Sequence, residues 1–285
     1  MQTIAVQRHD DGINAWAMAR GAASPQLAGL VDGYCDYSER TPGFTTRREL
    51  PHPDGVLIIN LGRRIHITAG DGAMLALEPG EAFVAGVHLR PALSHSDGEQ
   101  AGVHVFLPLA TLRRLVGAPM HTLIDQAVPL AILLGPEGRR LGEMLGERDS
   151  PAERFRLLDA WLSARVHAVE APAERALYAA DLLRRRPDLD IMGVAQEVGW
   201  SRKHLADRIH DLVGVGPRSF RRLIRFQRAT GAASVAAQPN WAAIAYDAGY
   251  ADQSHLVREF REFAGLTPTA YRARLLGEGG GLIEA

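Results

Sequence analysis

The sequence predicts an α+β protein with two domains. A β-rich barrel or sandwich with helices is expected over residues 1–170, followed by an all-α domain with two helix-turn-helix units over residues 171–285. Three observations lead to this prediction: short apolar runs separated by turn residues in the first 110 residues, helical periodicity from about residue 109, and an internal repeat in the last third of the chain. A chain of 285 residues is long enough for two hydrophobic cores.

Short apolar runs near the N-terminus have the length and flanking residues of β-strands. Gly, Pro and Asp clusters separate them, as in the turns between antiparallel strands. Short strands at such regular spacing predict a small barrel or a sandwich. The runs lie at 56–59, 64–68, 74–77, 82–85 and 103–107.

Helical spacing of apolar residues begins near residue 109 and is clearest from Gly138 to Val169. Asp149-Ser150-Pro151 interrupts this stretch and begins a new helix. The apolar stripe fits two alternatives equally well: packing on the β-rich domain, or a contact between two copies in a homodimer. Ala171-Pro172 is the expected linker to the second domain.

An internal repeat carries the C-terminal prediction. Residues 191–200 match residues 241–250, and both place apolar residues at the i, i+3, i+4, i+7 spacing of one buried helix face. In both copies a capping residue precedes the helix and a glycine stands where it ends. The matched pairs are Asp190 with Asn240, Ile191 with Trp241, Val194 with Ile244, Ala195 with Ala245, Val198 with Ala248, and Gly199 with Gly249.

A second helix follows each glycine, over 201–212 and 252–263. Ser201 and Asp252 can cap these helices, because their side-chain oxygens can accept from backbone N–H groups of the first turn. A helix, a glycine turn and a second helix form a helix-turn-helix pattern, and two copies in register strengthen this interpretation.

The two predicted units lie at about 190–213 and 240–264, joined by a connector helix at 217–231. A rigid connector would hold the second helix of each unit on a common side of the molecule. The spacing needed to enter successive major grooves of DNA is about 34 Å, one turn of the double helix.

Composition excludes several classes of protein. No apolar run approaches the length of about 18 residues that spans a bilayer, and Met1 to Asp11 lacks a signal-peptide core, so we expect a cytoplasmic protein without a membrane partner. The single cysteine, Cys35, cannot form a disulfide within the chain. The net charge is −1, with the basic excess in the C-terminal third.

The C-terminal 100 residues closely resemble the AraC/XylS family of bacterial transcriptional regulators. This resemblance implies a promoter-bound regulator, such as an activator, that acts with RNA polymerase on double-stranded DNA. The segments 51–53, 59–62 and 83–86 are similar to the sensor half of some actinobacterial members, which implies a cupin-like barrel. The C-terminal residues that carry the resemblance are Ala195, Gly199, Trp200, Ser201, His204, Leu205, Gly214, Pro217, Arg225, Ala229, Ile244, Ala245, Gly249, Tyr250, Ser254, Leu256, Arg258, Phe260, Gly265, Pro268 and Tyr271.

DNA contacts are expected from the outward faces of the two recognition helices. Arg and Lys can donate to guanine, Gln can bond adenine, and Val can contact a thymine methyl group. Asp207 departs from the family pattern; it would either accept from cytosine or pair with a neighbouring arginine. The predicted contact residues are Ser201, Arg202, Lys203, Ala206 and Asp207 in the first unit, and Gln253, Ser254, Val257 and Arg258 in the second.

The connector helix carries several arginines opposite its apolar face. A solvated face is the better explanation for most of these arginines, and some of them are expected to contact phosphate, with Arg218, Arg221 and Arg225 as the candidates.

The N-terminal half is expected to bind a small-molecule effector, as the resemblance implies. Candidates for the lining of its pocket are Trp16, Tyr34, Tyr37, Phe83 and His104. The alternatives are a protein-interaction module and, less simply, a metal-dependent cupin enzyme. The histidines of this half do not follow a metal-binding spacing, so we expect no metal, no cofactor and no catalysis.

Overall fold

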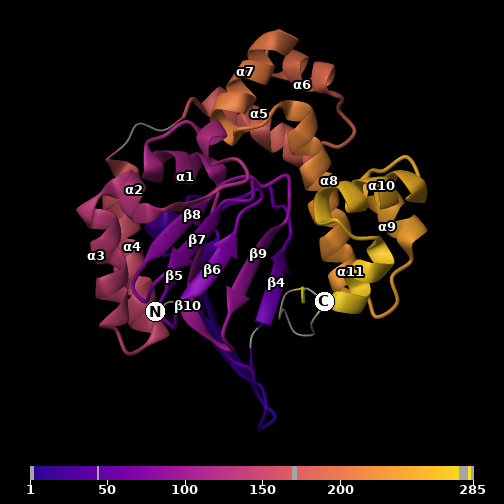
Figure 1. Ribbon diagram of the computed structural model, residues 1–285. Helices are drawn as coiled ribbons and strands as arrows, with labels where there is room; N and C mark the ends of the chain where they lie inside the picture. The colour runs from indigo at the N-terminus through magenta and orange to yellow at the C-terminus, as the bar shows by residue number, and fades with distance from the viewer. Residues whose placement is uncertain (1–2, 44, 169–171, 276–281, 284–285) are drawn as a thin grey trace.

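The computed structural model describes the whole chain except residues 1–2, 44, 169–171, 276–281 and 284–285. Two β-sheets form the N-terminal part, and the chain is predominantly helical from residue 109 onward (Figure 1). The α+β fold class is therefore confirmed. The predicted boundary at residue 170 and the start of the predicted linker, Ala171, lie outside the described residues.

Antiparallel pairing builds both sheets. The larger one has the order β1-β2-β3-β10-β5-β8-β11 and the smaller one the order β4-β9-β6-β7. All five predicted strands are present, as β5, β6, β7, β8 and β10. The bounds are β1 (Ile4–Asp10), β2 (Ala15–Gly21), β3 (Gly33–Arg40), β4 (Thr45–Glu49), β5 (Gly55–Asn60), β6 (Ile65–Thr68), β7 (Met74–Leu77), β8 (Ala82–Ala85), β9 (Ala92–Ser96), β10 (Glu99–Leu107) and β11 (Ala127–Pro129).

Helices cover the outer face of the larger sheet (Figure 1). They are α1 (Leu109–Val116), α2 (Leu130–Leu134), α3 (Pro136–Gly146) and α4 (Pro151–His167), with the short 3₁₀ turns η1 (Pro25–Leu27) and η2 (Met120–Leu123) beside them. Ser150 caps α4 at the predicted break, where its Oγ accepts from the N–H of Glu153. The apolar stripe on α3 and α4 is buried in the core, which accounts for it by packing within the chain: Leu141, Leu145, Phe155, Leu158 and Leu162.

The two faces of the larger sheet carry different side chains, because successive residues of a strand point to opposite sides. On β10, Val103, Val105 and Leu107 belong to the core beneath the helices. The residues between them, including His104, point to the inner face, toward the smaller sheet. A second apolar cluster closes part of this inner space: Ile65, Ile67, Leu77, Phe83 and Ala85.

The described residues of the C-terminal part form seven helices. They are α5 (Glu174–Arg185), α6 (Ile191–Glu197), α7 (Arg202–Val213), α8 (Pro217–Val235), α9 (Trp241–Ala248), α10 (Gln253–Ala264) and α11 (Pro268–Arg274). Helix-turn-helix pairs appear at α6–α7 and α9–α10, and the connector α8 extends four residues beyond its predicted end at residue 231. No helix within the described ranges is long and apolar enough to cross a membrane.

Candidate nucleic-acid interface

The first helix-turn-helix unit is held by local hydrogen bonds at both helix starts. Asp190 accepts from the N–H of Gly193 at 2.6 Å, and Ser201 accepts from the N–H of His204 at 3.1 Å. Gly199 has a φ of +65°, a conformation that is costly for residues with a Cβ, and so it permits the sharp turn between α6 and α7. The sequence therefore determines this unit locally.

Helix α7 buries one face and exposes the other. Leu205, Ile209 and Leu212 are buried, as their spacing predicted. The outward residues Ser201, Arg202, Lys203 and Asp207 are exposed, and Ala206 is half-buried. Among the described residues no ion pair forms at Asp207, so the predicted pairing with a neighbouring arginine is not seen there.

The second unit repeats this construction. The side chain of Asn240 accepts from the N–H groups of Ala242 and Ala243 at 3.2 and 3.1 Å, and Asp252 accepts from that of His255 at 2.7 Å. Gly249, with a φ of +88°, ends α9. Both caps and the left-handed glycine stand where the internal repeat placed them.

Helix α10 also presents a polar strip to solvent. Gln253, Ser254 and Arg258 are exposed and Val257 is half-buried. Leu256, Phe260 and Phe263 fill the core, where the ring of Phe260 lies 5.1 Å from that of Phe226 on the connector helix. The two recognition helices thus offer accessible side chains of the types that bind base edges.

The three connector arginines predicted to contact phosphates have different environments. Arg218 is exposed. Arg221 donates to the carbonyl of Arg186 at 3.1 Å, and burial lowers the pKa of its guanidinium. Arg225 donates to Glu259 at 3.0 Å and lies over the ring of Tyr250 at 5.3 Å. Arg218 is therefore the most available of the three for a phosphate.

A buried carboxylate, Glu259, holds the second unit to the connector helix. Its side chain is 4% exposed, and its Oε1 accepts from Arg222 at 2.8 Å and from Arg225 at 3.0 Å, with His255 at 3.5 Å. Burial and the nearby Glu259 carboxylate both raise the pKa of Tyr250. Arg225 and Arg222 precede Glu259 by 34 and 37 positions in the sequence, so only the fold brings these side chains together. No sequence pattern distinguished Glu259 from an ordinary acidic residue on the surface of a helix.

The predicted effector-pocket residues divide between two faces of the larger sheet. Tyr34 lies on the outer face, stacked on Phe155 at 5.2 Å, with its hydroxyl donating to Asp159 at 2.7 Å. Tyr37 and His104 lie on the inner face, where their rings contact edge to face at 4.7 Å.

The remaining two candidates are also on the inner side. Phe83 is buried in the inner apolar cluster. Trp16 stands opposite Glu39 in the β2–β3 pairing, and it stacks on His9 at 5.9 Å. It lines a groove of about 580 Å³ at the open end of the larger sheet. The structure thus brings Tyr37 and His104 together, places Trp16 at an end of the sheet, and separates Tyr34 from them.

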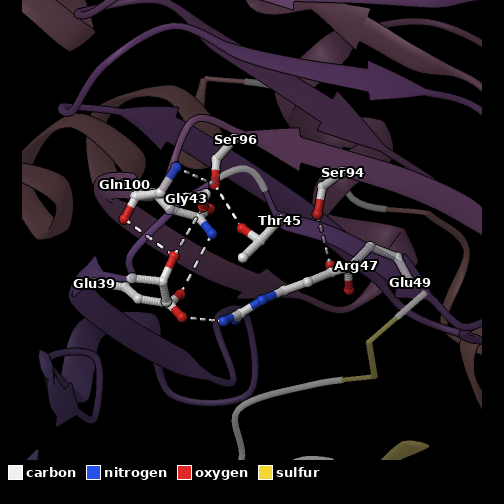
Figure 2. A network of polar contacts seen from close by, with 10 residues as sticks. Glu39, Gly43, Thr45, Arg47, Glu49, Ser94, Ser96 and Gln100 are labelled. Atoms are coloured by element: carbon white, nitrogen blue, oxygen red, sulfur yellow. Dashed lines mark hydrogen bonds and ion pairs between the residues drawn. The ribbon is translucent and has the colours of Figure 1, made fainter. Parts of the chain in front are cut away.

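Polar side chains join the two sheets across the inner space (Figure 2). Arg47 of β4 pairs with Glu39 of β3, which also accepts from the amide of Gln100 at 3.3 Å. Glu49 accepts from the hydroxyl of Ser94 at 3.2 Å. Within the described residues, no group of three His, Cys, Asp or Glu side chains is arranged to hold a metal ion.

Two helix-turn-helix units, each with an exposed second helix, define a DNA-binding protein. Residues 194–274 match the family model described as "Helix-turn-helix domain". These residues therefore form a helix-turn-helix domain, a kind of domain that binds DNA.

Two solved structures of ToxT share the fold over most of the chain. ToxT from Vibrio cholerae is 13% identical, with a TM-score of 0.50 over 86% of this chain and 98% of that chain. An apo variant of ToxT is also 13% identical, with a TM-score of 0.51 over 85% of this chain and 98% of that chain. The C-terminal domain of AraT, a response regulator from Geobacillus stearothermophilus, is 22% identical over 38% of this chain and 93% of that chain, with a TM-score of 0.35. No curated protein matches the chain.

Proposed function

We propose that the chain regulates transcription in response to a small molecule bound between the two N-terminal sheets. Binding there would change the positions of the two recognition helices and therefore the affinity of the protein for its operator DNA. RNA polymerase would act at the promoter next to this operator. One observation carries this proposal: each helix-turn-helix unit contacts the N-terminal part separately, close to the C-terminal end of its recognition helix.

The first unit rests on η2 and α1. Asp211 of α7 accepts from Arg113 at 3.1 Å, and the rings of His210 and His121 stack at 5.4 Å. At Gly214, which ends α7, a Cβ would lie 2.8 Å from the carbonyl oxygen of Met120. A larger residue at 214 would therefore force the two parts of the chain apart.

The second unit is attached to the edge strand β4. Arg48 donates from its Nη1 to the carbonyl of Ala264, the last residue of α10, at 3.0 Å. The backbone N–H of Arg48 donates to the carbonyl of Leu282 at 2.8 Å, so this residue is also attached to β4.

The two neighbours of Arg48 on β4 face the inner space instead. Arg47 pairs with Glu39 and Glu49 bonds Ser94, both between the sheets. The short strand β4 carries side chains that face the space between the sheets and also the side chain that holds α10. A ligand that shifts β4 would therefore displace the second recognition helix. The coupling element we propose is β4.

DNA contacts would come from the predicted strips on α7 and α10, with Arg218 reaching a phosphate. The decisive measurement is fluorescence anisotropy of the full chain with DNA fragments recovered by genome-wide mapping of its bound sites. We expect tight binding to these fragments and affinity that falls steeply with salt. Equal affinity for recovered and unrelated fragments would refute sequence-specific regulation.

Control by the N-terminal part is tested separately with Arg48→Ala, which frees α10 from β4. We expect this variant to change operator affinity in the absence of effector, and Arg139→Ala, which removes an exposed arginine of α3, to leave it unchanged. If Arg48→Ala and Arg139→Ala bind the operator as the unmodified chain does, control through β4 fails while DNA binding stands.

A homodimer would double the number of half-sites and favour palindromic or tandem operators. Sedimentation of the full chain at micromolar concentration, with and without operator, checks this part of the proposal; a monomer in both cases would exclude it.

A further inference from the structure

One continuous segment of the N-terminal part, residues 48–54, contacts helices on both sides of the connector; we call it the bridging segment. At its start, Arg48 donates to the carbonyl of Ala264, the last residue of α10, at 3.0 Å. At its end, Asp54 binds the guanidinium of Arg184 on α5. Helix α5 packs against α6, α7 and α8, so it belongs to the same body as the first helix-turn-helix unit. The bridging segment therefore links the second unit to the first by a route other than the connector helix.

The contact between Asp54 and Arg184 is a two-pronged ion pair. Nη1 of Arg184 donates to Oδ2 of Asp54 at 3.2 Å, and Nη2 donates to Oδ1. The two side chains are 34% and 18% exposed, and the guanidinium lies 5.6 Å from the centre of the Phe220 ring on α8. The carbonyl of Arg184 also accepts from Arg228 of α8. Because a two-pronged pair fixes direction as well as distance, Asp54 orients the end of α5 against the N-terminal part.

His52 adds a contact to the connector helix. Its Nε2 lies 2.7 Å from the side-chain amide of Gln227 on α8, and its Nδ1 accepts from the backbone N–H of Asp54 at 3.2 Å. The second of these hydrogen bonds holds His52 and Asp54 in one local arrangement. The bridging segment is thus attached to α5, α8 and α10.

The bridging segment is stiff. Pro51 and Pro53 are both buried. A proline ring fixes its own φ and restricts the residue before it, so the backbone from Leu50 to Pro53 has few alternative conformations. On one side β4 pairs with β9 over its whole length, and on the other side β5 begins at Gly55. A stiff segment held in a sheet at both ends can keep its contacts at fixed positions.

We propose that the bridging segment fixes the distance and angle between the two recognition helices, and that Asp54 is a positioning residue for the operator spacing that the chain reads. The inference rests on the proposed function, in which both units bind one operator. A single helix between two units permits them to turn about its axis, and a second link restricts this rotation. One extra base pair between two contacted grooves moves them apart by about 3.4 Å and turns them by about 34–36°, so the restriction decides which spacing fits.

The test measures the affinity of the full chain for operators of different spacing. Footprinting on an operator recovered by genome-wide mapping locates the two contacted stretches, and one base pair is then inserted or removed between them. By fluorescence anisotropy, the unmodified chain should bind both altered fragments about tenfold or more weakly than the original. Asp54→Ala should reduce this penalty to about threefold or less, because its units adjust to the altered spacing. A penalty in Asp54→Ala equal to that of the unmodified chain overturns the proposal.

Asp97→Ala is the matched control. Asp97 also pairs with an arginine, Arg63, at 3.2 Å, but both residues belong to the N-terminal part. This variant changes the net charge by the same amount as Asp54→Ala and should keep the full spacing penalty. An equal reduction of the penalty in Asp97→Ala would attribute the effect to net charge and overturn the positioning role.

Arg184→Ala removes the same ion pair from the other side, so it decides the proposal even if Asp54→Ala does not fold. It should reduce the spacing penalty as Asp54→Ala does. The double variant Asp54→Ala/Arg184→Ala should show no further reduction, because the two side chains act as one contact. Reductions that add in the double variant would show that the ion pair is not the cause.

The same measurements separate this inference from the proposed function. If the unmodified chain binds its operator specifically and tolerates altered spacing, sequence-specific regulation stands and the positioning role is overturned. If the spacing penalty follows Asp54 while no small molecule changes operator affinity, effector control fails and the positioning role stands. Equal affinity for recovered and unrelated fragments overturns both.

Discussion

Replacing Glu259 with Gln tests whether the second helix-turn-helix unit depends on a buried charge. Glu259 accepts from Arg222 and Arg225 through one oxygen atom, and its side chain is 4% exposed. Glutamine keeps the shape but removes the charge, and it leaves the guanidinium of Arg225 without its ion pair. Arg222 keeps its second partner, Glu262.

The contacts themselves set the expected magnitude. Removing one partner of a buried ion pair costs about 3–5 kcal/mol, and each hydrogen bond to a charged group contributes about 1.5–3 kcal/mol. The side chains of Arg222 and Arg225 are 33% and 26% exposed, so water compensates for part of the loss. We therefore expect Glu259→Gln to lower the free energy of unfolding by about 2–3 kcal/mol.

Urea denaturation of the full chain measures this change, with Glu262→Gln as the matched control. Glu262 pairs with the same Arg222 but is 57% exposed, so its loss should cost less than about 1 kcal/mol. If the two variants lose the same free energy of unfolding, burial does not make the ion pairs of Glu259 more important for stability than the exposed pair of Glu262.

The remaining predictions concern base reading, backbone conformation and pH. Arg258→Ala should cost about 1–3 kcal/mol at the cognate operator and relax one base position, as measured by anisotropy on a set of single-base variants; equal binding would contradict the contact. Gly231→Ala, in open space on α8, should raise stability by about 0.5–1 kcal/mol, whereas Gly199→Ala, at a φ of +65°, should lower it by about 1–2 kcal/mol in the same urea assay. Stability changes of the same sign in both variants, or the reverse of these signs, would show that backbone conformation does not decide these two positions. Burial lowers the pKa of His104 to about 4 from 6.5, so its neutral form is favoured in the folded state. The stability that this provides is complete above pH 6.5 and is lost as the pH falls toward 4, so the unmodified chain should lose stability relative to His104→Gln over that range; a constant difference would refute the shift.

Several strands could not be predicted because their residues carry no apolar alternation. β4 reads Thr-Thr-Arg-Arg-Glu, and all five side chains are polar. It forms a strand because β9 pairs with it and because its inward arginine has Glu39 opposite. β1 is an edge strand with six of its seven residues exposed, so no buried face was available to reveal it. In both cases the partner strand, rather than local propensity, decides the conformation.

The helix-turn-helix units were predictable because their information is local. A capping side chain bonds an N–H two or three residues away, a glycine relieves strain at its own φ angle, and i, i+3, i+4 spacing places apolar residues on one face. Asp190, Ser201, Asn240 and Asp252 cap their helices as expected. The DNA-contact residues follow from the same helical periodicity and stay predictions until DNA binding is measured.

The amino-acid sequence by itself determined the two repeated units, the connector between them and the exposed faces of their recognition helices, because each depends on contacts within about one or two helical turns. Only the tertiary structure decided that Glu259 lies under two arginines of another helix, that Tyr34 and Tyr37 point to opposite sides of a sheet, and that Arg48 holds α10 while Arg47 and Glu49 face the inner space. Those contacts join residues far apart along the chain, and their energies depend on burial and on strand register, which no local pattern encodes.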